Sequence, residues 1–325
     1  MRKTFQDIAT KFQLHYSFND DSHYMNAFTK NKCEYEALQI IKEVACILGV
    51  TLDIDSEALL EGGLKDIWKI IGKNSNQISI ILVLVTIIFS RIPPSNKELE
   101  DLQKQEITLS IEEKQLKIEK LKRELKKEIE YIPSEDIEEC VKIMNHQVKI
   151  TKHKSNYYET LLKYNKVKNI GISILNEKNN IIGDEKIIDR KDFHKYVLID
   201  NDLPSEVDDN AIIQIVSPVL EKGDYKWKGI YLNEVISYSM KDAEFKKAVL
   251  RKEVTFQSGT FIEVELEKKR RINSMGEIEI QGYSVSTVIR ISNSDETIET
   301  KQGAALKAKN ENHRRQMLLF EDNAD

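Results

Sequence analysis

A run of uncharged residues interrupts an otherwise highly charged chain. From Ile78 to Phe89 no side chain is more polar than Ser79 or Thr86, although 32% of the 325 residues are charged. A helix spanning residues 74–92 would rise about 28 Å. The hydrocarbon core of a bilayer is about 30 Å thick, so the run is only just long enough to cross one.

Three structures fit this run: a membrane-inserted helix, a helix buried in a protein core, or a buried strand, which its β-branched residues would favour. The flanking residues favour membrane insertion. Lys73 and Arg91 lie at the two ends, where long cationic side chains can reach the membrane surface. Pro93 and Pro94 would end the helix.

Four hydroxyl side chains lie on one face of this expected helix. At about 100° per residue, they fall within about 60° of one another: Ser75, Ser79, Thr86 and Ser90. In a bundle of such helices this face would point inward, where it would allow close packing or line a polar pore. The alternative is packing alone, with each hydroxyl bonded to a carbonyl of its own helix.

The next segment has a coiled-coil pattern. Apolar residues recur every seven positions from 95 to 132, in two registers and under dense mixed charge. These residues are Leu102, Leu109 and Leu116, then Ile111, Ile118, Leu125 and Ile132. We expect a homo-oligomer, or a helical hairpin in which a second helix, up to about residue 165, folds back on the first. A long helix packed on its own chain is the alternative.

The rest of the chain combines helix and strand patterns. Residues 27–48 carry apolar residues at helical spacing, residues 50–55 alternate as a strand, and residues 64–71 have the spacing of a short helix. Alternating strands dominate after Val167. The predicted fold class is therefore α+β, in five parts: a small N-terminal α/β module (1–73), a hydrophobic, transmembrane segment (74–92), a long coiled-coil-like helical region (95–165), a β-rich domain (166–295) and a polar tail (296–325).

No motif indicates an enzyme. The sequence has no glycine-rich phosphate loop, no serine nucleophile elbow and no HExxH, so we predict neither catalysis nor a cofactor. Asp20, Asp21 and His23, with His15 nearby, are metal-ligand residue types. Their spacing matches no ligand pattern, and a polar turn explains them better. The three cysteines show no pairing pattern, which fits a reducing compartment.

Two basic clusters are the candidate ligand-binding residues. In Lys226-Trp227-Lys228 an aromatic residue lies between two cations, an arrangement that can stack a base and neutralise phosphates. The second cluster is the run Lys268-Lys269-Arg270-Arg271, next to an alternating strand. Both predict an oligonucleotide or nucleotide ligand. An ordinary solvated surface, or a patch for a protein or for lipid headgroups, is the alternative.

The layout from Lys65 to Ile132 resembles the single-span membrane-channel subunits of Hailong-type bacterial anti-phage defence systems. In those systems a partner nucleotidyltransferase makes an oligonucleotide that a tetrameric channel binds. The resemblance implies a tetrameric ion channel in the bacterial inner membrane, gated by such a ligand. Since the N-terminus does not have the pattern of a secretory signal peptide, we expect the N-terminal module to be cytoplasmic. The alternative function is a soluble oligomeric scaffold or adaptor with the apolar run buried in its core.

Overall fold

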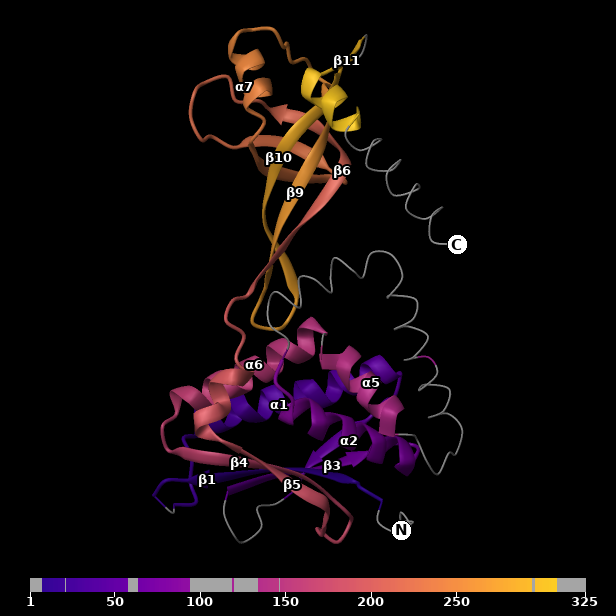
Figure 1. The fold of residues 1–325 in the computed structure, drawn as a ribbon, viewed down its shortest axis with the longest axis vertical. Coiled ribbons are helices and arrows are strands. Elements are labelled where there is room, and N and C mark those ends of the chain that lie inside the picture. The colour runs from indigo at the N-terminus through magenta and orange to yellow at the C-terminus, as the bar shows by residue number, and fades with distance from the viewer. Residues whose placement is uncertain are drawn as a thin grey trace, which may run out of the picture. The chain divides into compact units, whose positions relative to one another are not determined.

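The computed structural model describes residues 8–20, 22–57, 64–93, 119, 134–145, 147–293 and 296–308. The chain divides into two compact units, each with its own hydrophobic core (Figure 1). Unit 1 comprises Met1–Asn201 and Ile272–Glu277, and unit 2 comprises Asp202–Arg271 and Ile278–Asp325.

An antiparallel sheet forms one layer of unit 1. β1 lies at its centre, where Leu14 pairs with Asp66 of β3 on one side and with Ile172 of β4 on the other. Segments that flank the apolar run and the heptad region therefore belong to one sheet. The strand order is β2 (Asp53–Ser56), β3 (Leu64–Ile71), β1 (Lys11–Phe18), β4 (Val167–Leu175) and β5 (Ile181–Asp189).

Helices cover one face of this sheet, as Figure 1 shows for unit 1. Phe12, Leu14 and Tyr16 alternate along β1 and belong to the core between sheet and helices, because successive strand residues point to opposite faces. The helices are α1 (Ala27–Leu48), α2 (Ser75–Ser90), α5 (Ser134–Asn145) and α6 (Val148–Lys163), and the 3-10 helix η1 (Arg190–Tyr196) follows β5.

The predicted helix at residues 27–48 is confirmed as α1. The Asn26 side chain caps its first turn by accepting a hydrogen bond from the backbone N–H of Thr29, at 3.1 Å. Gly49 ends it in the left-handed conformation, with φ of 68°, and donates its N–H back to the helix. Both ends of α1 are therefore determined by residue types that can be recognised as helix caps in the sequence.

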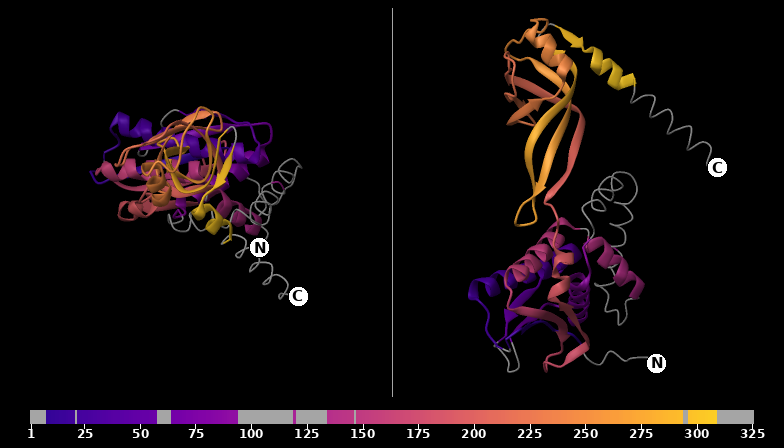
Figure 2. Two further views of the ribbon diagram at one scale, coloured as in Figure 1. Left: turned by 90° about the horizontal axis from the view of Figure 1, so that it is seen from above. Right: turned by 60° about the vertical axis from the view of Figure 1, so that its left-hand side comes forward.

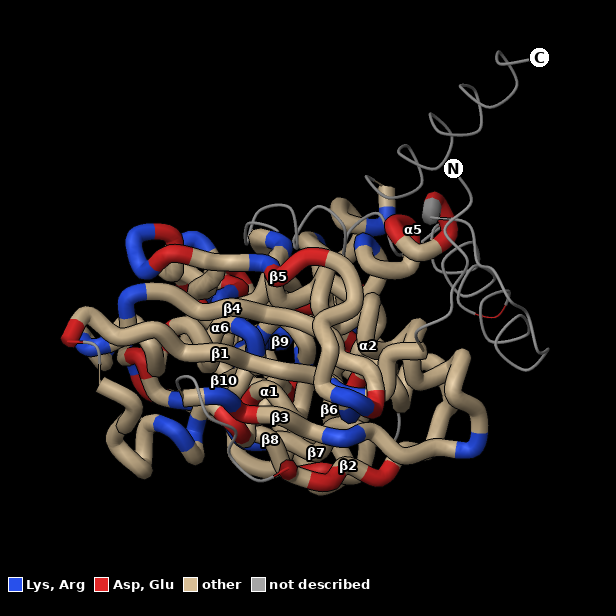
Figure 3. The backbone as a smooth tube through the Cα atoms, turned by 90° about the horizontal axis from the view of Figure 1, so that it is seen from below, with Lys and Arg blue, Asp and Glu red and all other residues tan. Residues whose placement is uncertain are grey.

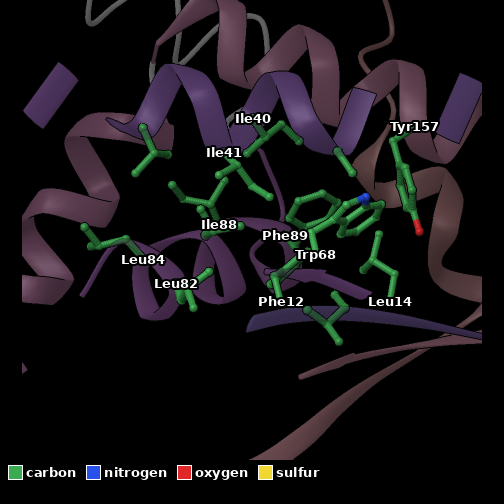
Figure 4. Close-up of a cluster of buried hydrophobic side chains, with 14 of the residues drawn as sticks. Phe12, Leu14, Ile40, Ile41, Trp68, Leu82, Leu84, Ile88, Phe89 and Tyr157 are labelled. Carbon is green, nitrogen blue, oxygen red and sulfur yellow. The ribbon is translucent and has the colours of Figure 1, made fainter. Parts of the chain in front are cut away.

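The apolar run forms α2, a helix in the core of unit 1. Phe89 is fully buried and packs 5.6 Å from Phe12 and 5.4 Å from Tyr157, ring centre to ring centre (Figure 4). Burying one such side chain contributes about 1.5–3 kcal/mol. The completely buried α2 residues are Ile81, Leu82, Leu84, Val85, Ile88 and Phe89.

The prediction of a transmembrane helix, and with it of an inner-membrane ion channel, is therefore wrong. α2 has 16 residues, which at about 1.5 Å each gives about 24 Å. Its apolar side chains contact α1, α5, β4 and β5 of the same chain. Among the described residues, no helix is long and apolar enough to cross a membrane. The run is uniformly apolar because protein surrounds it on most sides.

The prediction of a long helical hairpin is also wrong for the residues that the structure describes. The second helix, expected to continue to about residue 165, is broken into α5 and α6, and both helices belong to unit 1. α6 is largely buried and pairs its polar side chains within the unit: His153 Nδ1 lies 2.7 Å from Glu36 Oε2 of α1. The heptad segment at 95–132 lies outside the described residues except for Glu119.

Residues 64–71 form the strand β3, where the apolar spacing predicted a short helix. Trp68 and Ile70 point into the core, and Ile67 on the opposite face is also only 2% exposed. Burial on both faces hides the two-residue period of a strand. Residues on both sides of the predicted boundary at residue 73 thus lie in one compact unit.

Unit 2 is a closed five-stranded barrel. β6 pairs with β7 and with β9, β7 pairs with β8, and β10 pairs with both β8 and β9, which closes the ring. The β8–β10 pair is parallel, with Tyr238 opposite Tyr283. Seen from above, the strands of unit 2 curl around a common interior (Figure 2). The strands are β6 (Asp202–Ser217), β7 (Trp227–Tyr231), β8 (Glu234–Met240), β9 (Phe261–Ile272) and β10 (Ile278–Ser292).

Short elements complete unit 2. α7 (Ala243–Leu250) connects β8 to β9, and its cap Asp242 accepts hydrogen bonds from the N–H groups of Phe245 and Val288. The edge strand β11 (Thr297–Glu299) pairs with the end of β10. The alternating strands predicted after Val167 are confirmed, among them β6, β9 and β10.

Candidate ligand-binding surface

The hydroxyl face of α2 does not line a pore. Thr86 Oγ1 donates a hydrogen bond to the carbonyl of Leu82 at 2.8 Å, and Ser90 Oγ donates to the carbonyl of Thr86 at 3.0 Å. Ser79 is half-buried and Ser75 is exposed at the start of the helix. The alternative of packing, with hydroxyls bonded within their own helix, therefore describes Thr86 and Ser90.

Trp227 belongs to the barrel core and cannot stack a ligand. It is 2% exposed and packs against three aromatic rings with centre distances of 5.6 to 6.3 Å, those of Tyr238, Phe245 and Phe256. Successive residues of a strand point to opposite faces, so Lys228 points outward. Lys226 precedes the strand and is also exposed. Only the two cations of this predicted cluster are available to a ligand.

The run Lys268–Arg271 is divided between two faces of β9 and neutralised by β6. Lys268 Nζ lies 3.0 Å from Glu206 Oε1, and Arg270 Nη1 lies 3.5 Å from the other oxygen of the same carboxylate. Lys269 and Arg271 both approach Asp202, at 3.9 and 3.6 Å. Burial alone would lower the pKa of Lys268, but its bonds to Glu206 and Tyr231 outweigh that effect and raise the pKa. These cations are therefore already paired within the chain.

An exposed aromatic residue lies close to Lys226 in the loop 218–226 between β6 and β7. Tyr225 is 65% exposed, and its ring lies against Gly223, where a Cβ atom would come within 2.7 Å of the ring. Gly223 has φ of 146°, a conformation that favours glycine. The loop also carries Lys222, so Tyr225 lies between two lysines in sequence. In the sequence, the place of Tyr225 between Gly223 and Trp227, the first residue of β7, indicates an exposed loop residue.

Among the described residues, these lysines have no acidic partner within ion-pair distance. In this part of the chain, no ion pair within 4.0 Å involves Lys222, Lys226 or Lys228, and all three side chains are exposed. The loop also contains Glu221 and Asp224, which balance Lys222 and Lys226, so the only excess positive charge comes from Lys228 on β7. We call Lys222, Tyr225, Lys226 and Lys228 the lysine–tyrosine cluster.

A row of three apolar side chains and one glutamine crosses the outer face of the barrel beside this cluster. Phe261 of β9 is opposite Gln214 of β6, Gln214 is opposite Ile230 of β7, and Ile230 is opposite Val235 of β8. Val235 is 70% exposed and Phe261 41% exposed. We call these four residues the cross-strand row. Apolar side chains on an outer sheet face are the feature that could contact a planar or apolar ligand group.

No metal site is found among the residues that the structure describes. Asp20 accepts a hydrogen bond from the Ser22 hydroxyl at 2.7 Å and lies 3.3 Å from Lys166 Nζ, as expected of a polar turn. His15 Nδ1 lies 3.6 Å from Glu185, on the sheet face where Figure 3 shows charges of both signs interspersed. Asp21 lies outside the described residues.

Comparisons of the chain with protein-family models, with curated proteins and with solved structures found no match.

Proposed function

We propose that this protein is a non-enzymatic adaptor whose unit 2 binds an oligonucleotide at the lysine–tyrosine cluster. Unit 1, with α2 in its core, is the scaffold. The observation that carries the proposal is an exposed aromatic ring among three lysines that have no acidic partner in the described part of the chain. Cations that follow the phosphates, combined with a ring on which a base can stack, are the common components of single-strand binding sites.

The connectivity of unit 2 supports the same proposal. A five-stranded barrel with a β6–β7–β8 meander, a helix before β9 and a parallel β8–β10 pair resembles the OB-fold. Barrels of that kind bind oligonucleotides or oligosaccharides on the face of their second and third strands and on the loop between their first two. Here those positions are β7, β8 and loop 218–226. This support is an analogy of fold, and the residues named above carry the chemistry.

The test is fluorescence anisotropy of the full chain with a labelled single-stranded 20-mer at several salt concentrations. Three phosphate contacts predict a slope of log K against log [salt] of about −2. Replacing Lys222, Lys226 and Lys228 together by Gln should weaken binding by at least tenfold and bring the slope close to zero.

A matched control replaces three exposed lysines of unit 1 by Gln: Lys42, Lys168 and Lys186. The control removes the same charge and should change the affinity less than twofold. Equal losses in the two triple variants would mean that only net charge matters, and absence of binding by the unaltered chain would end the proposal.

A second candidate function is an adaptor that binds no nucleic acid and acts as an oligomeric scaffold. The burial of α2 in unit 1 favours it over any membrane role, and the sevenfold apolar pattern at 95–132 is the reason to expect oligomers. The molar mass of the full chain by light scattering tests it. A monomeric mass at micromolar concentration would contradict it.

A further inference from the structure

A short helix over residues 301–308 is fixed to the barrel of unit 2 through its first turn. Its Gly303 lies so close to β10 that a Cβ atom there would come within 2.4 Å of the carbonyl oxygen of Ile289. Gln302 Nε2 donates a hydrogen bond to Asp242 Oδ2, at 3.0 Å. Asp242 also caps α7, so the helix is bonded to a residue that the barrel itself holds in place. The chain therefore leaves this helix from a defined point on unit 2.

The sequence after this helix contains one group of large apolar residues. Residues 309–316 are all polar or charged, and Glu321 and Asp322 follow the group. Residues 309–325 lie outside the part of the chain that the structure describes. At full extension the seven residues 309–315 span about 25 Å, which limits how far the group can lie from the helix. The group consists of Met317, Leu318, Leu319 and Phe320.

Four consecutive apolar residues do not have the spacing of an amphipathic helix. Successive helical residues turn by about 100°, so residues 317–320 would spread over about 300° of a helix and could not be buried together against one surface. In an extended peptide, neighbouring side chains point to opposite sides and can enter separate pockets of a groove. The pattern therefore favours a peptide that a partner protein binds in an apolar groove.

Three residues determine which kind of groove fits. Gln316, Leu319 and Phe320 have the spacing Gln-x-x-Leu-Phe. In this arrangement an amide can hydrogen-bond at the rim of a groove, while a branched and an aromatic side chain fill its pockets as anchors. Bacterial DNA sliding clamps bind short peptides of this spacing in a groove of this chemistry. A clamp encircles DNA, so it is a partner that an oligonucleotide-binding chain would meet on the same molecule.

We propose that residues 316–320 are a docking peptide for a protein with such a groove, the sliding clamp of DNA replication. Leu319 and Phe320 are the anchors, and Gln316 bonds the rim of the groove. Helix 301–308 provides the fixed end of the tether that keeps unit 2 beside the clamp. This interaction uses none of the residues of the lysine–tyrosine cluster, so it goes beyond the proposed function and stands even if that function fails.

The test is biolayer interferometry of the full chain on an immobilised bacterial sliding clamp. The unaltered chain should bind, and Leu319→Ser should weaken binding by at least about tenfold, because it removes a buried anchor. Leu318→Ser is the matched control, since it makes the same change one residue earlier, and should weaken binding by less than about threefold. Gln316→Ala should weaken binding by about fivefold through the lost hydrogen bond.

The outcomes separate docking on a clamp from the alternatives. Equal losses in Leu318→Ser and Leu319→Ser would mean unspecific apolar contact and would overturn the proposal. Absence of binding at about 100 µM clamp would overturn it as well. A lower midpoint of thermal unfolding for Leu319→Ser would show that this residue packs within its own chain, which also contradicts docking. Oligonucleotide binding by Leu319→Ser should match that of the unaltered chain, which keeps this result distinguishable from failure of the proposed function.

Discussion

Lys154 of α6 donates a hydrogen bond through Nζ to the carbonyl of Arg91, at 2.9 Å, just beyond the end of α2. The same ammonium group donates to the carbonyl of Ile88 at 3.2 Å and to the Asn145 side chain. A fully buried lysine thus satisfies carbonyls at the C-terminal end of the apolar helix, which would otherwise lack partners. This contact shows how a core, rather than a lipid bilayer, accommodates the end of α2.

Replacing Lys154 by Met should destabilise the protein by about 3 kcal/mol, because each buried acceptor left without a donor costs about 1–3 kcal/mol. Urea denaturation measures the difference. Lys163→Met, on the exposed side of the same helix, is the control and should change the free energy of unfolding by less than about 0.5 kcal/mol. Similar losses in both variants would show that Lys154 does not act as a cap.

Arg190→Lys should lower stability by about 2 kcal/mol, although it keeps the charge. The Arg190 guanidinium donates to the carbonyls of Leu161, Leu162 and Tyr164 at 2.6 to 2.9 Å, at the end of α6. A lysine cannot reproduce this planar set of donors. Thermal unfolding should show a lower midpoint than for Arg251→Lys, an exposed control. An unchanged midpoint would contradict the capping role.

Glu267 should make unit 2 sensitive to acid. Hydrogen bonds from Lys241 and then Ser284 lower the pKa of Glu267 to about 2. The folded pKa is below the unfolded value of about 4.3, so the stabilisation is present above pH 4.3 and is lost as the pH falls toward 2. Because the group is largely solvated, the effect is no more than about 1 kcal/mol.

The measurement compares the free energies of unfolding of the parent chain and Glu267→Gln at pH 7 and pH 2.5. The difference should be present at pH 7 and small at pH 2.5. Glu253→Gln, another exposed position, should show no such change. A difference that persists at pH 2.5 would show that packing, and not charge, is responsible.

Tyr225→Ala should weaken oligonucleotide binding by roughly 5- to 150-fold, since stacking contributes about 1–3 kcal/mol per base. Tyr225→Phe should retain the affinity because it keeps the ring. Phe28→Ala is the control, because Phe28 is an exposed ring of unit 1. Equal affinities for the Ala and Phe variants at position 225 would show that no base stacks there.

The sequence predicts those elements whose periodicity has one clear cause. Residues 27–48 repeat at helical spacing because one face of α1 is buried, and residues 262–266 alternate because β9 has one inner and one outer face. The apolar run predicts a membrane helix wrongly, because a helix buried by protein and a helix buried by lipid have the same composition. Which of the two applies depends on contacts with α1, α5 and the sheet, which are distant in sequence.

The candidate site is predicted only in part by the sequence, again because contacts between residues distant in sequence decide which side chains are exposed. Lys226 and Lys228 are exposed as expected, but their neighbour Trp227 faces inward because it follows the strand alternation. The charge of Lys268 to Arg271 was overestimated because Asp202 and Glu206, more than sixty positions earlier, pair with it. The cross-strand row becomes visible only once the registers of four strands are known.

Photocrosslinking tests most directly where nucleic acid binds. A single strand carrying 4-thiothymidine would be irradiated with the full chain, and the crosslinked peptides identified by mass spectrometry. We predict crosslinks within residues 218–237, with Tyr225 the main position, and their loss in the Lys222, Lys226 and Lys228 triple variant. Crosslinks confined to residues 268–271 or to unit 1 would contradict the account.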